Sequence, residues 1–405
     1  MQKIAIIGGG PSGIMAGITA LQNTDKDLDI TIFDKHQPLK TLLYTGGGRC
    51  NLSYAEYDSR RLVKFYPRGE KFLLSPFVKF GVKNTQEFFF KLGVDTYIQD
   101  DNRIFPTSDN AEDVRYALLD EARNLGIKFE KLEIESIKKI GDKFLIFDGN
   151  EKFEFDKVVI STGGNRLKPK FSGYKFAKSL GHSITELRPI LCGLETKENL
   201  CQKLSGLTIK NLNAKVIFNG KMIQKIKGDL LFTHKGISGP LAYKTSSYCA
   251  YCDFNKQNPL TLEINFTGKP LNIFDKEFAQ KINQNQKKNL FNIIIEYLPR
   301  SMTELLMKEL NFNLDKKAGS LIKNERVKLS KILTEFQLHI TRANLSEAIV
   351  TAGGVDLKEI NGKTMESKII KGLYFCGEIL DVDGLTGGFN LQACWSTGYI
   401  AGSSL

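Results

Sequence analysis

The chain has 405 residues, more than a single hydrophobic core usually contains, so two or three domains are expected. Hydrophobic residues make up 41% and charged residues 25%, values ordinary for a soluble globular protein. No apolar stretch approaches the roughly 18 residues of a membrane span, which excludes an integral membrane protein. The net charge is +12, which favours a polyanionic partner unless the lysines are simply scattered over the surface.

The ends and the cysteines predict a cytoplasmic protein with no membrane partner. The apolar run near the N-terminus is short and is followed by glycines, unlike a signal peptide. Seven cysteines, an odd and scattered set, indicate reduced thiols rather than a disulfide framework. Cys249 and Cys252 form a lone C-x-x-C, for which an accident of sequence is favoured over a zinc or redox role. No metal site is predicted.

The N-terminal region has the pattern of a nucleotide-binding fold. Residues 3–8 predict a short buried strand, followed by a glycine turn, a helix from Pro11 to about Leu21 and a second strand over 29–34. This order is typical of the first half of a doubly wound parallel sheet. Further elements are expected beyond it: helices at 85–93 and 111–126, and strands at 127–137, 143–155 and 157–160.

The pattern changes twice in the middle of the chain. Residues 188–270 contain short alternating segments, which predict a β-barrel-like insert with a closing strand near 336–342. Residues 271–335 predict a small helical basic domain. Buried strands and glycine turns return over 343–405. The simplest architecture is an α/β nucleotide-binding domain formed by residues 1–187 and 343–405, which carries both inserts.

Residues 8–13, GGGPSG, fit the G-x-G-x-x-G pattern, which alone is a weak signal. Here they follow a strand and begin a helix, and an acidic residue, Asp34, stands at the end of the next strand, as a dinucleotide site requires. Gly8 permits the tight turn, Gly10 lets the backbone approach a pyrophosphate, and Gly13 lets the helix pack against the strand. Asp34 is expected to accept hydrogen bonds from a ribose.

The C-terminal region identifies the dinucleotide as FAD. A strand over 372–376 leads into Gly377 and Glu378, and a glycine-rich segment at 383–388 precedes a helix that starts near Asn390. An NAD domain needs no such returning unit, whereas FAD extends from the first helix to a helix near the flavin ring. The N-terminus of that last helix would face the flavin N1–C2=O edge, where negative charge develops on reduction.

Several further motifs carry a resemblance to a known family. Residues 45–51 read TGGGRCN, and they are accompanied by motifs at 103–108, 228–240, 351–355, 364–368 and 372–402. On these motifs the chain resembles the BaiN/RdsA-like family of NAD(P)/FAD-dependent oxidoreductases over nearly its full length. The resemblance implies a fold of the two-dinucleotide flavoprotein kind: a discontinuous Rossmann-type FAD-binding domain, a β-barrel-like insert and a small helical domain. The short basic loop at 165–174 departs from the family and weakens inferences about the substrate.

The candidate catalytic residues are Arg49, Cys50 and His234. Arg49 and the amides of residues 46–48 are expected to contact an anion or the flavin edge. Cys50 is either a proton donor with a near-neutral pKa or a small residue packed beneath the flavin. His234 is a second acid–base candidate, although a loop-stabilising role is favoured.

The residues expected to hold FAD come from all of these segments. They are Gly8, Gly10, Pro11, Ser12, Gly13, Asp34, Lys35, Gly47, Gly48, Arg49, Cys50, Asn51, Ile134, Thr162, Gly163, Gly377, Glu378, Asp383, Gly388, Phe389, Asn390 and Leu391. No second G-x-G-x-x-G follows a strand, so a separate NAD(P)H domain is not expected. NAD(P)H, the expected electron donor, would dock transiently at the flavin, unless another donor is used.

The positive charge is concentrated in one region. Residues 281–331 contain eleven Lys or Arg and five acids, a balance of +6, and basic clusters at 60–61 and 64–71 add to it. A surface that docks RNA is favoured slightly over a solvated lysine-rich face. Members of the family reduce carbon–carbon double bonds; one branch makes dihydrouridine in large-subunit ribosomal RNA and another is linked to bile acids. The basic insert agrees with the RNA branch.

The leading hypothesis is therefore an FAD enzyme that uses NAD(P)H to reduce a conjugated C=C bond, preferably in uridine of 23S ribosomal RNA. A small-molecule flavin reductase or amine oxidase is a second hypothesis. A third is a flavin-loaded RNA-binding or redox-sensing protein without catalysis. The sequence makes no prediction of the oligomeric state.

Overall fold

The computed structural model describes residues 1–23, 27–164 and 173–405, so most of the loop at 165–174 lies outside the described residues. The chain divides into two compact units. Unit 1 consists of Met1–Pro189 and Ile349–Leu405, and unit 2 consists of Ile190–Ala348. None of the helices in the described ranges has both the length and the apolar character needed to cross a lipid bilayer.

Unit 1 is built around a five-stranded sheet in the order β19-β10-β1-β2-β6, in which neighbouring strands pair in parallel. Its strands are buried and rich in β-branched residues, as strands covered on both faces require. The register places Ile160 opposite Ile7 on one side and opposite Phe375 on the other. These strands are β1 (Gln2–Ile7), β2 (Leu28–Phe33), β6 (Lys128–Glu130), β10 (Lys157–Ile160) and β19 (Leu373–Phe375).

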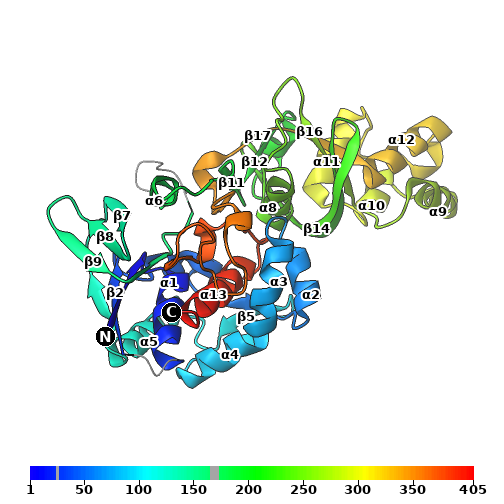
Figure 1. Ribbon diagram of the computed structural model, residues 1–405. Coiled ribbons are helices and arrows are strands. Elements are labelled where there is room, and N and C mark those ends of the chain that lie inside the picture. Colours follow the sequence, from blue (N-terminus) through cyan, green and yellow to red (C-terminus); the bar gives the residue numbers. More distant parts are fainter. Residues whose placement is uncertain (24–26, 165–172) are drawn as a thin grey trace. The chain divides into compact units, whose positions relative to one another are not determined.

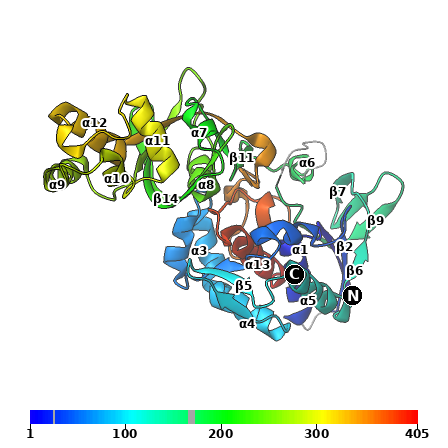
Figure 2. The same cartoon turned by 180° about the vertical axis from the view of Figure 1, so that it is seen from behind.

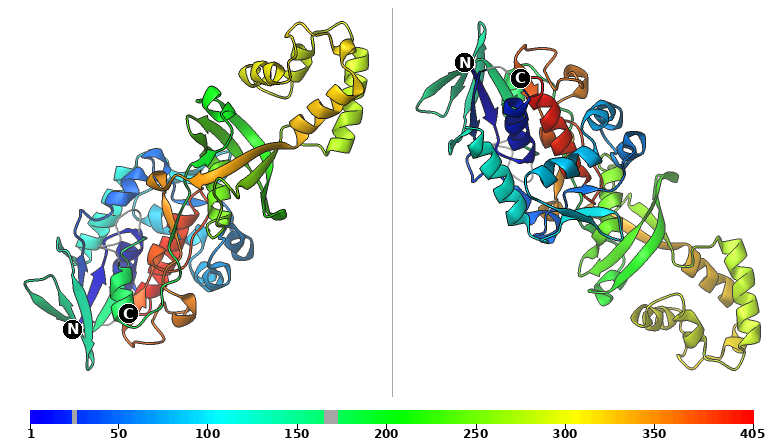
Figure 3. Two further views of the ribbon diagram at one scale, coloured as in Figure 1. Left: turned by 90° about the horizontal axis from the view of Figure 1, so that it is seen from above. Right: turned by 90° about the horizontal axis from the view of Figure 1, so that it is seen from below.

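Two helices from opposite ends of the chain lie against each other in unit 1: α1 (Pro11–Gln22) and α13 (Phe389–Gly402). Figures 1 and 3 show them side by side, α1 in blue and α13 in red. Their close approach depends on the absence of a side chain at Gly398, where a Cβ atom would lie 2.5 Å from the Ser12 carbonyl oxygen. The first and last segments of the sequence are therefore packed together.

Smaller elements complete unit 1. A sheet of order β3-β5-β4 and a sheet of order β7-β8-β9 accompany the main sheet, and β11 (Arg188–Ile190) crosses the boundary between the units. The other elements are η1 (Lys40–Gly47), β3 (Ser53–Tyr54), α2 (Ser59–Leu62), η2 (Val63–Phe65), α3 (Glu70–Lys79), α4 (Val82–Lys91), β4 (Thr96–Ile98), β5 (Arg103–Pro106), α5 (Ala111–Asn124), β7 (Ser136–Ile140), β8 (Lys143–Phe147), β9 (Lys152–Phe155), α6 (Tyr174–Ser179), β18 (Val350–Ala352), η6 (Leu357–Glu359) and η7 (Gly377–Ile379).

Two of the expected strands are corrected by the structure. The segment 127–137 is not one strand: it contributes β6 to the parallel sheet and the start of β7 to a separate antiparallel sheet. The segment 143–155 is a hairpin of β8 and β9. Its turn is stabilised by the Asp148 carboxylate, which accepts hydrogen bonds from the N–H groups of Asn150 and Glu151.

Unit 2 contains a closed six-stranded barrel in the order β12-β15-β14-β13-β16-β17, together with helices that share one hydrophobic core with it. Alternating apolar residues point into the barrel, as in β16, where Leu260, Leu262 and Ile264 are buried. Helices α9 to α12 lie together in unit 2 (Figure 2). The elements are β12 (Leu194–Thr196), α7 (Leu200–Lys203), β13 (Thr208–Phe218), β14 (Lys221–Thr233), β15 (Gly236–Ser238), α8 (Gly239–Tyr248), β16 (Leu260–Asn265), α9 (Leu271–Gln284), α10 (Leu290–Ile294), α11 (Arg300–Glu309), η4 (Ala318–Ser320), α12 (Lys323–Thr334), β17 (Phe336–Ala343) and η5 (Leu345–Glu347).

Candidate cofactor site

The turn between β1 and α1 requires glycine at positions 8 and 13. Gly8 has a φ of 109°, and a Cβ atom on it would lie 2.6 Å from the Ser161 carbonyl oxygen. A Cβ atom on Gly13 would overlap the Gly8 carbonyl oxygen. By contrast, the position beside Gly10 is open: among the described residues, no atom lies within 4 Å of where a side chain would begin. The turn is therefore closely packed at Gly8 and Gly13 and open at Gly10, where α1 begins.

The N-terminus of α1 offers main-chain donors. No side chain of the described residues caps the helix at Gly10, and the Ile14 N–H donates to the Gly10 carbonyl oxygen at 3.0 Å. The N–H groups of Ser12 and Gly13 precede that bond in the first turn. Uncapped N–H groups and the positive end of the helix dipole form a site for an anion such as a pyrophosphate.

Asp34 follows β2 and lies beside the glycine turn. One carboxylate oxygen accepts the Gly9 N–H at 2.8 Å, and the other accepts the His36 N–H at 2.8 Å. These bonds hold the carboxylate at the edge where a ribose is expected. Lys35 is exposed and forms an ion pair with Glu133 at 3.3 Å.

The C-terminal half of the site lies directly against this turn. The Ser12 hydroxyl donates to the Cys376 carbonyl oxygen at 3.3 Å, and the Gly377 N–H donates to the Thr397 hydroxyl oxygen at 2.9 Å. Residues 364 positions apart are thus in contact. As the sequence predicts, the two ends of the chain come together around one site.

Glu378 and the segment after β10 form a further wall. The Glu378 carboxylate accepts the Thr351 N–H at 2.9 Å, and a Cβ atom on Gly164 would overlap it. Gly163 has a φ of 73°, and no atom of the described residues lies within 4 Å of its Cβ position. The Thr162 hydroxyl is buried and has no hydrogen-bond partner among the described residues, so it is a polar group for which a ligand could supply the missing partner.

The GGGRCN segment forms a loop in left-handed backbone conformations, with φ values of 58°, 70° and 87° at Gly46, Gly47 and Gly48. The Gly48 carbonyl oxygen accepts the Ala111 N–H at 3.0 Å, so the loop is fixed to the start of α5. Within the part of the chain that the structure describes, no atom lies within 4 Å of the Cβ position of Gly47. The loop therefore presents bare backbone to open space.

Arg49 is held by stacking and by one acid. Its guanidinium carbon lies 4.0 Å from the centre of the Phe105 ring, and its Nη1 lies 3.4 Å from an Asp109 oxygen. Tyr97 donates its hydroxyl to the same oxygen at 2.8 Å. The cation is thus restrained in direction but keeps donors for an anionic group.

Cys50 is fully buried, with a φ of 61°. Burial raises the pKa of its thiol to about 12. The near-neutral pKa expected from the sequence is therefore wrong for this structure, because burial raises the pKa of the thiol more than its hydrogen bond with the Thr45 side chain lowers it. This geometry agrees with the alternative expectation of a small packed residue.

Asn51 connects the loop to α13. In the orientation that satisfies its neighbours, its amide nitrogen donates to the carbonyl oxygens of Ser53 and Ile104, at 2.9 and 3.2 Å, and its oxygen accepts the Gly388 N–H at 3.1 Å.

Asn390 stabilises the turn that precedes α13. Its side chain donates to the Gly384 carbonyl oxygen at 2.9 Å and accepts the Gly384 N–H at 2.8 Å.

The N-terminus of α13 resembles that of α1 in its free donors. It begins after Gly388, which has a φ of 95° and provides no side-chain cap, and its first helical bond is from the Gln392 N–H to the Gly388 carbonyl oxygen at 3.0 Å. The N–H groups of Asn390 and Leu391 lie in the first turn. Phe389 is buried and stacks on Phe65 with ring centres 4.5 Å apart.

The remaining candidates lie in different surroundings. Asp383 is fully buried, and both of its carboxylate oxygens accept hydrogen bonds from the Arg68 guanidinium. Ile134 is 8% exposed, in the segment between β6 and β7. His234 is exposed at the turn between β14 and β15, and belongs to unit 2.

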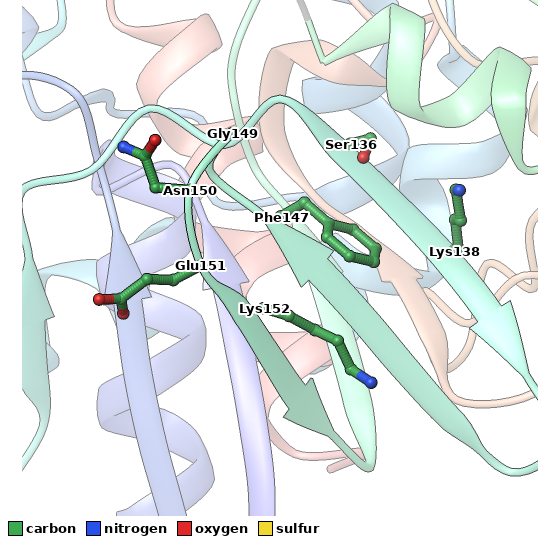
Figure 4. A pocket seen from close by; sticks show the side chains of 7 residues that line it. All are labelled: Ser136, Lys138, Phe147, Gly149, Asn150, Glu151 and Lys152. Atoms are coloured by element: carbon green, nitrogen blue, oxygen red, sulfur yellow. The ribbon is translucent and has the colours of Figure 1, made fainter.

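A surface pocket on the β7-β8-β9 sheet contributes nothing to this site. Figure 4 shows its side chains, including Phe147, Glu151 and two lysines, Lys138 and Lys152. None of its lining residues is among the cofactor candidates. Its lysines are exposed, and exposed lysines alone do not form a specific anion site.

Three residues of unit 1 that bear on the site were not predicted. Arg68 was recognised only as part of a basic cluster, because its partner Asp383 is 315 positions away. Thr351 binds Glu378 through its main chain, so its place in the motif at 351–355 was the available signal. Asp381 has a pKa raised by burial and one oxygen without a hydrogen-bond partner among the described residues; its place in the motif at 372–402 was the available signal.

These features fit a dinucleotide that extends between two helices. Two uncapped helix N-termini, bare backbone at Gly10, Gly47 and Gly163, and a buried hydroxyl without a partner all belong to unit 1. A pyrophosphate suits the first helix and an electron-rich ring edge suits the second.

Comparison with known proteins agrees with this geometry. The HI0933-like protein Rossmann domain model matches residues 2–404. A 3-dehydro-bile acid delta(4,6)-reductase from Clostridium scindens is 30% identical and covers 99% of this chain and 98% of its own. A ribosomal RNA dihydrouridine synthase from Haemophilus influenzae is 27% identical, and one from Escherichia coli is 26% identical; each alignment covers 99% of this chain and 97% of the relative.

A solved structure supports the fold. The 3-ketosteroid delta1-dehydrogenase from Sterolibacterium denitrificans superposes with a TM-score of 0.50 over 99% of each chain, at 10% identity. The Rossmann-type FAD-binding α/β fold expected from the sequence is confirmed, and a barrel is present. The chain belongs to the HI0933-like Rossmann family of FAD-dependent oxidoreductases.

Proposed function

We propose that this flavoprotein uses NAD(P)H to reduce a conjugated C=C bond, and that its preferred substrate is uridine in 23S ribosomal RNA. The observation that carries the choice of substrate is a set of exposed, unneutralised lysines on the helices of unit 2. The two relatives named ribosomal RNA dihydrouridine synthase support the same choice.

The acids of the basic region are largely occupied. Glu296 pairs with Lys281, Glu304 with Arg300, and Glu325 with Lys316. Arg326 pairs with Asp275 of α9. The lysines of this region that remain exposed without a carboxylate partner among the described residues are Lys287, Lys288, Lys308, Lys317, Lys323, Lys328 and Lys331.

Helix α12 concentrates three of these lysines on its solvent face. Lys323, Lys328 and Lys331 are exposed, whereas Leu329 and Leu333 are buried on the opposite face. Like charges that repel one another without compensation cost stability, so their presence favours a bound polyanion. RNA phosphates provide the complementary charge, and their binding releases counterions.

FAD, when bound, supplies the hydride chemistry. The first turn of α1 would hold the pyrophosphate, Asp34 a ribose hydroxyl, and the first turn of α13 the flavin edge that becomes electron-rich. Arg49 and the loop amides at 46–48 would restrain the ring or an anionic substrate group. We propose the remaining cofactor contacts for the other residues expected to hold FAD, apart from Asp383, whose carboxylate oxygens are bound by Arg68.

Substrate reduction also needs a proton. We propose Cys50 as its donor, acting as a neutral thiol, and His234 as a further acid–base candidate. Cys50→Ala should then lower the rate of substrate reduction about a hundredfold while the rate of flavin reduction by NADPH stays unchanged. Equal loss in both half-reactions would assign Cys50 to packing alone.

The test of the substrate is the dihydrouridine content of 23S ribosomal RNA. Mass spectrometry should find one dihydrouridine absent from the RNA of a deletion strain and restored by a plasmid copy. An unchanged content in the deletion strain contradicts the proposal.

A small-molecule reductase is the second candidate, because the Clostridium scindens relative acts on a bile acid and is 30% identical. This function predicts turnover of a 4-ene-3-oxo steroid that is insensitive to salt. Turnover of RNA should instead fall steeply with ionic strength.

A further inference from the structure

Arg68 and Asp383 form an ion pair beside the start of α13. The Asp383 side chain is 0% exposed and that of Arg68 is 15% exposed. Nε and Nη2 of Arg68 donate to different oxygens of the carboxylate, so the contact is bidentate. A planar fork that binds two oxygens fixes orientation as well as distance.

The pair is part of a larger clasp, formed by residues 65–68 on one side and 383–389 on the other. The Leu385 N–H donates to the Phe65 carbonyl oxygen at 2.9 Å. The Tyr66 hydroxyl donates to the Phe389 carbonyl oxygen at 2.6 Å, inside the first turn of α13. The clasp therefore determines where α13 begins and in which direction its free N–H groups point.

The charges of the clasp matter as well as its geometry. An unpaired carboxylate near a helix N-terminus would weaken the attraction of that terminus for a second anion. Arg68 neutralises Asp383 at short range, so the loop is fixed by an acid without adding net negative charge beside α13. Burial makes this compensation necessary, since an isolated carboxylate is costly to remove from water.

We propose that Arg68 and Asp383 are positioning residues that direct the N-terminus of α13 at the flavin and thereby set its reduction potential. Asp383 acts through Arg68 and does not itself contact FAD. The inference rests on the proposed placement of the flavin edge at α13. It is independent of the substrate, because the potential is a property of the FAD-loaded protein alone.

The test is the two-electron potential of Arg68→Lys, measured against a reference dye in the FAD-loaded protein without substrate. Lysine keeps the charge but loses the fork, so α13 is held less accurately and reduced flavin is stabilised less. The equilibrium constant for reduction should fall about tenfold, about 30 mV for a two-electron couple. Asp383→Glu keeps both charges but lengthens the acidic side chain, and it should also lower the reduction potential of the flavin.

The matched control is Arg326→Lys. Arg326 forms a similar bidentate pair with Asp275, at 2.9 and 3.1 Å, in unit 2. Its replacement should leave the flavin potential unchanged. If Arg68→Lys binds FAD with the wild-type potential, the inference is wrong, whatever the enzyme reduces. If only Asp383→Glu weakens FAD binding, Asp383 contacts the cofactor directly.

A neutral double variant covers the case in which Arg68→Lys does not fold. Arg68→Gln with Asp383→Asn removes both buried charges while it keeps hydrogen-bonding groups. This variant should also bind FAD with a lowered potential. A wild-type potential in a folded double variant would overturn the inference.

Discussion

The cradle of unit 1 (the turn at residues 8–13, the loop at 46–48 and the first turns of α1 and α13) is built differently from the basic helices of unit 2, where we propose that RNA binds. In the cradle, the main chain itself forms the site: Gly8 and Gly13 occupy places where any side chain would collide with main chain. On α12, where we propose that RNA binds, the charged surface consists of the exposed lysines Lys323, Lys328 and Lys331. The cofactor site should therefore fail at one substitution, whereas the RNA surface should weaken by increments.

The largest effect is expected from Gly13→Ala. Its methyl group would overlap the Gly8 carbonyl oxygen, so α1 must move from β1 at a cost of about 3 kcal/mol, and FAD binding should be lost. Flavin absorbance per mole of purified protein measures this. Gly10→Ala is the matched variant: it meets no protein atom, so it should fold normally and still bind FAD more weakly. A yellow Gly13→Ala protein with normal stability would refute this description of the cradle.

The next effect concerns the clasp. Arg68→Ala leaves the fully buried Asp383 without its cation and should lower the free energy of unfolding by about 3 kcal/mol. Arg326→Ala should cost less, because both side chains of that pair are about one-fifth exposed, at 22% and 21%. Urea unfolding of both variants compares them, and equal losses would contradict the ranking.

Much of the cradle could be predicted because its determinants are local. The turn at 8–13 and the helix now observed from Phe389 depend on glycines and apolar runs next to each other in the sequence. The Arg68–Asp383 pair could not be predicted, because its two residues are 315 positions apart in the sequence and are brought together only by the fold. The pKa of Cys50 was mispredicted for the same reason, since burial arises from tertiary packing. The segment 127–137 shows a further limit: apolar patterning does not reveal where a chain leaves one sheet for another.

A smaller effect is expected on the basic surface. A triple variant with Lys323→Glu, Lys328→Glu and Lys331→Glu should bind 23S ribosomal RNA more weakly. Each lost phosphate contact should reduce the slope of log K against log salt concentration by about 1. Electrophoretic mobility shifts at several salt concentrations give the slope. Lys138→Glu with Lys152→Glu, in the pocket of Figure 4, is the control and should leave it unchanged. The same slope in the triple variant would remove α12 from the RNA surface.

The smallest effect is on stability in alkali. Burial raises the pKa of the Cys50 and Cys376 thiols from an ordinary 9.0 to about 12. The folded chain thus keeps protons that the unfolded chain loses, so this contribution is complete below about pH 9 and disappears as the pH rises towards 12. Under reducing conditions, the free energy of unfolding should decline above pH 9, and less steeply in Cys50→Ala. A flat profile in the wild type would show that these thiols are less buried than described.

The most direct test of the whole account is reconstitution. Purified FAD-loaded protein, NADPH and 23S ribosomal RNA from the deletion strain should react without oxygen to give RNA with one uridine heavier by two hydrogens, in amounts that fall as salt is raised. RNA of unchanged mass, with flavin that NADPH reduces normally, would contradict the proposed substrate.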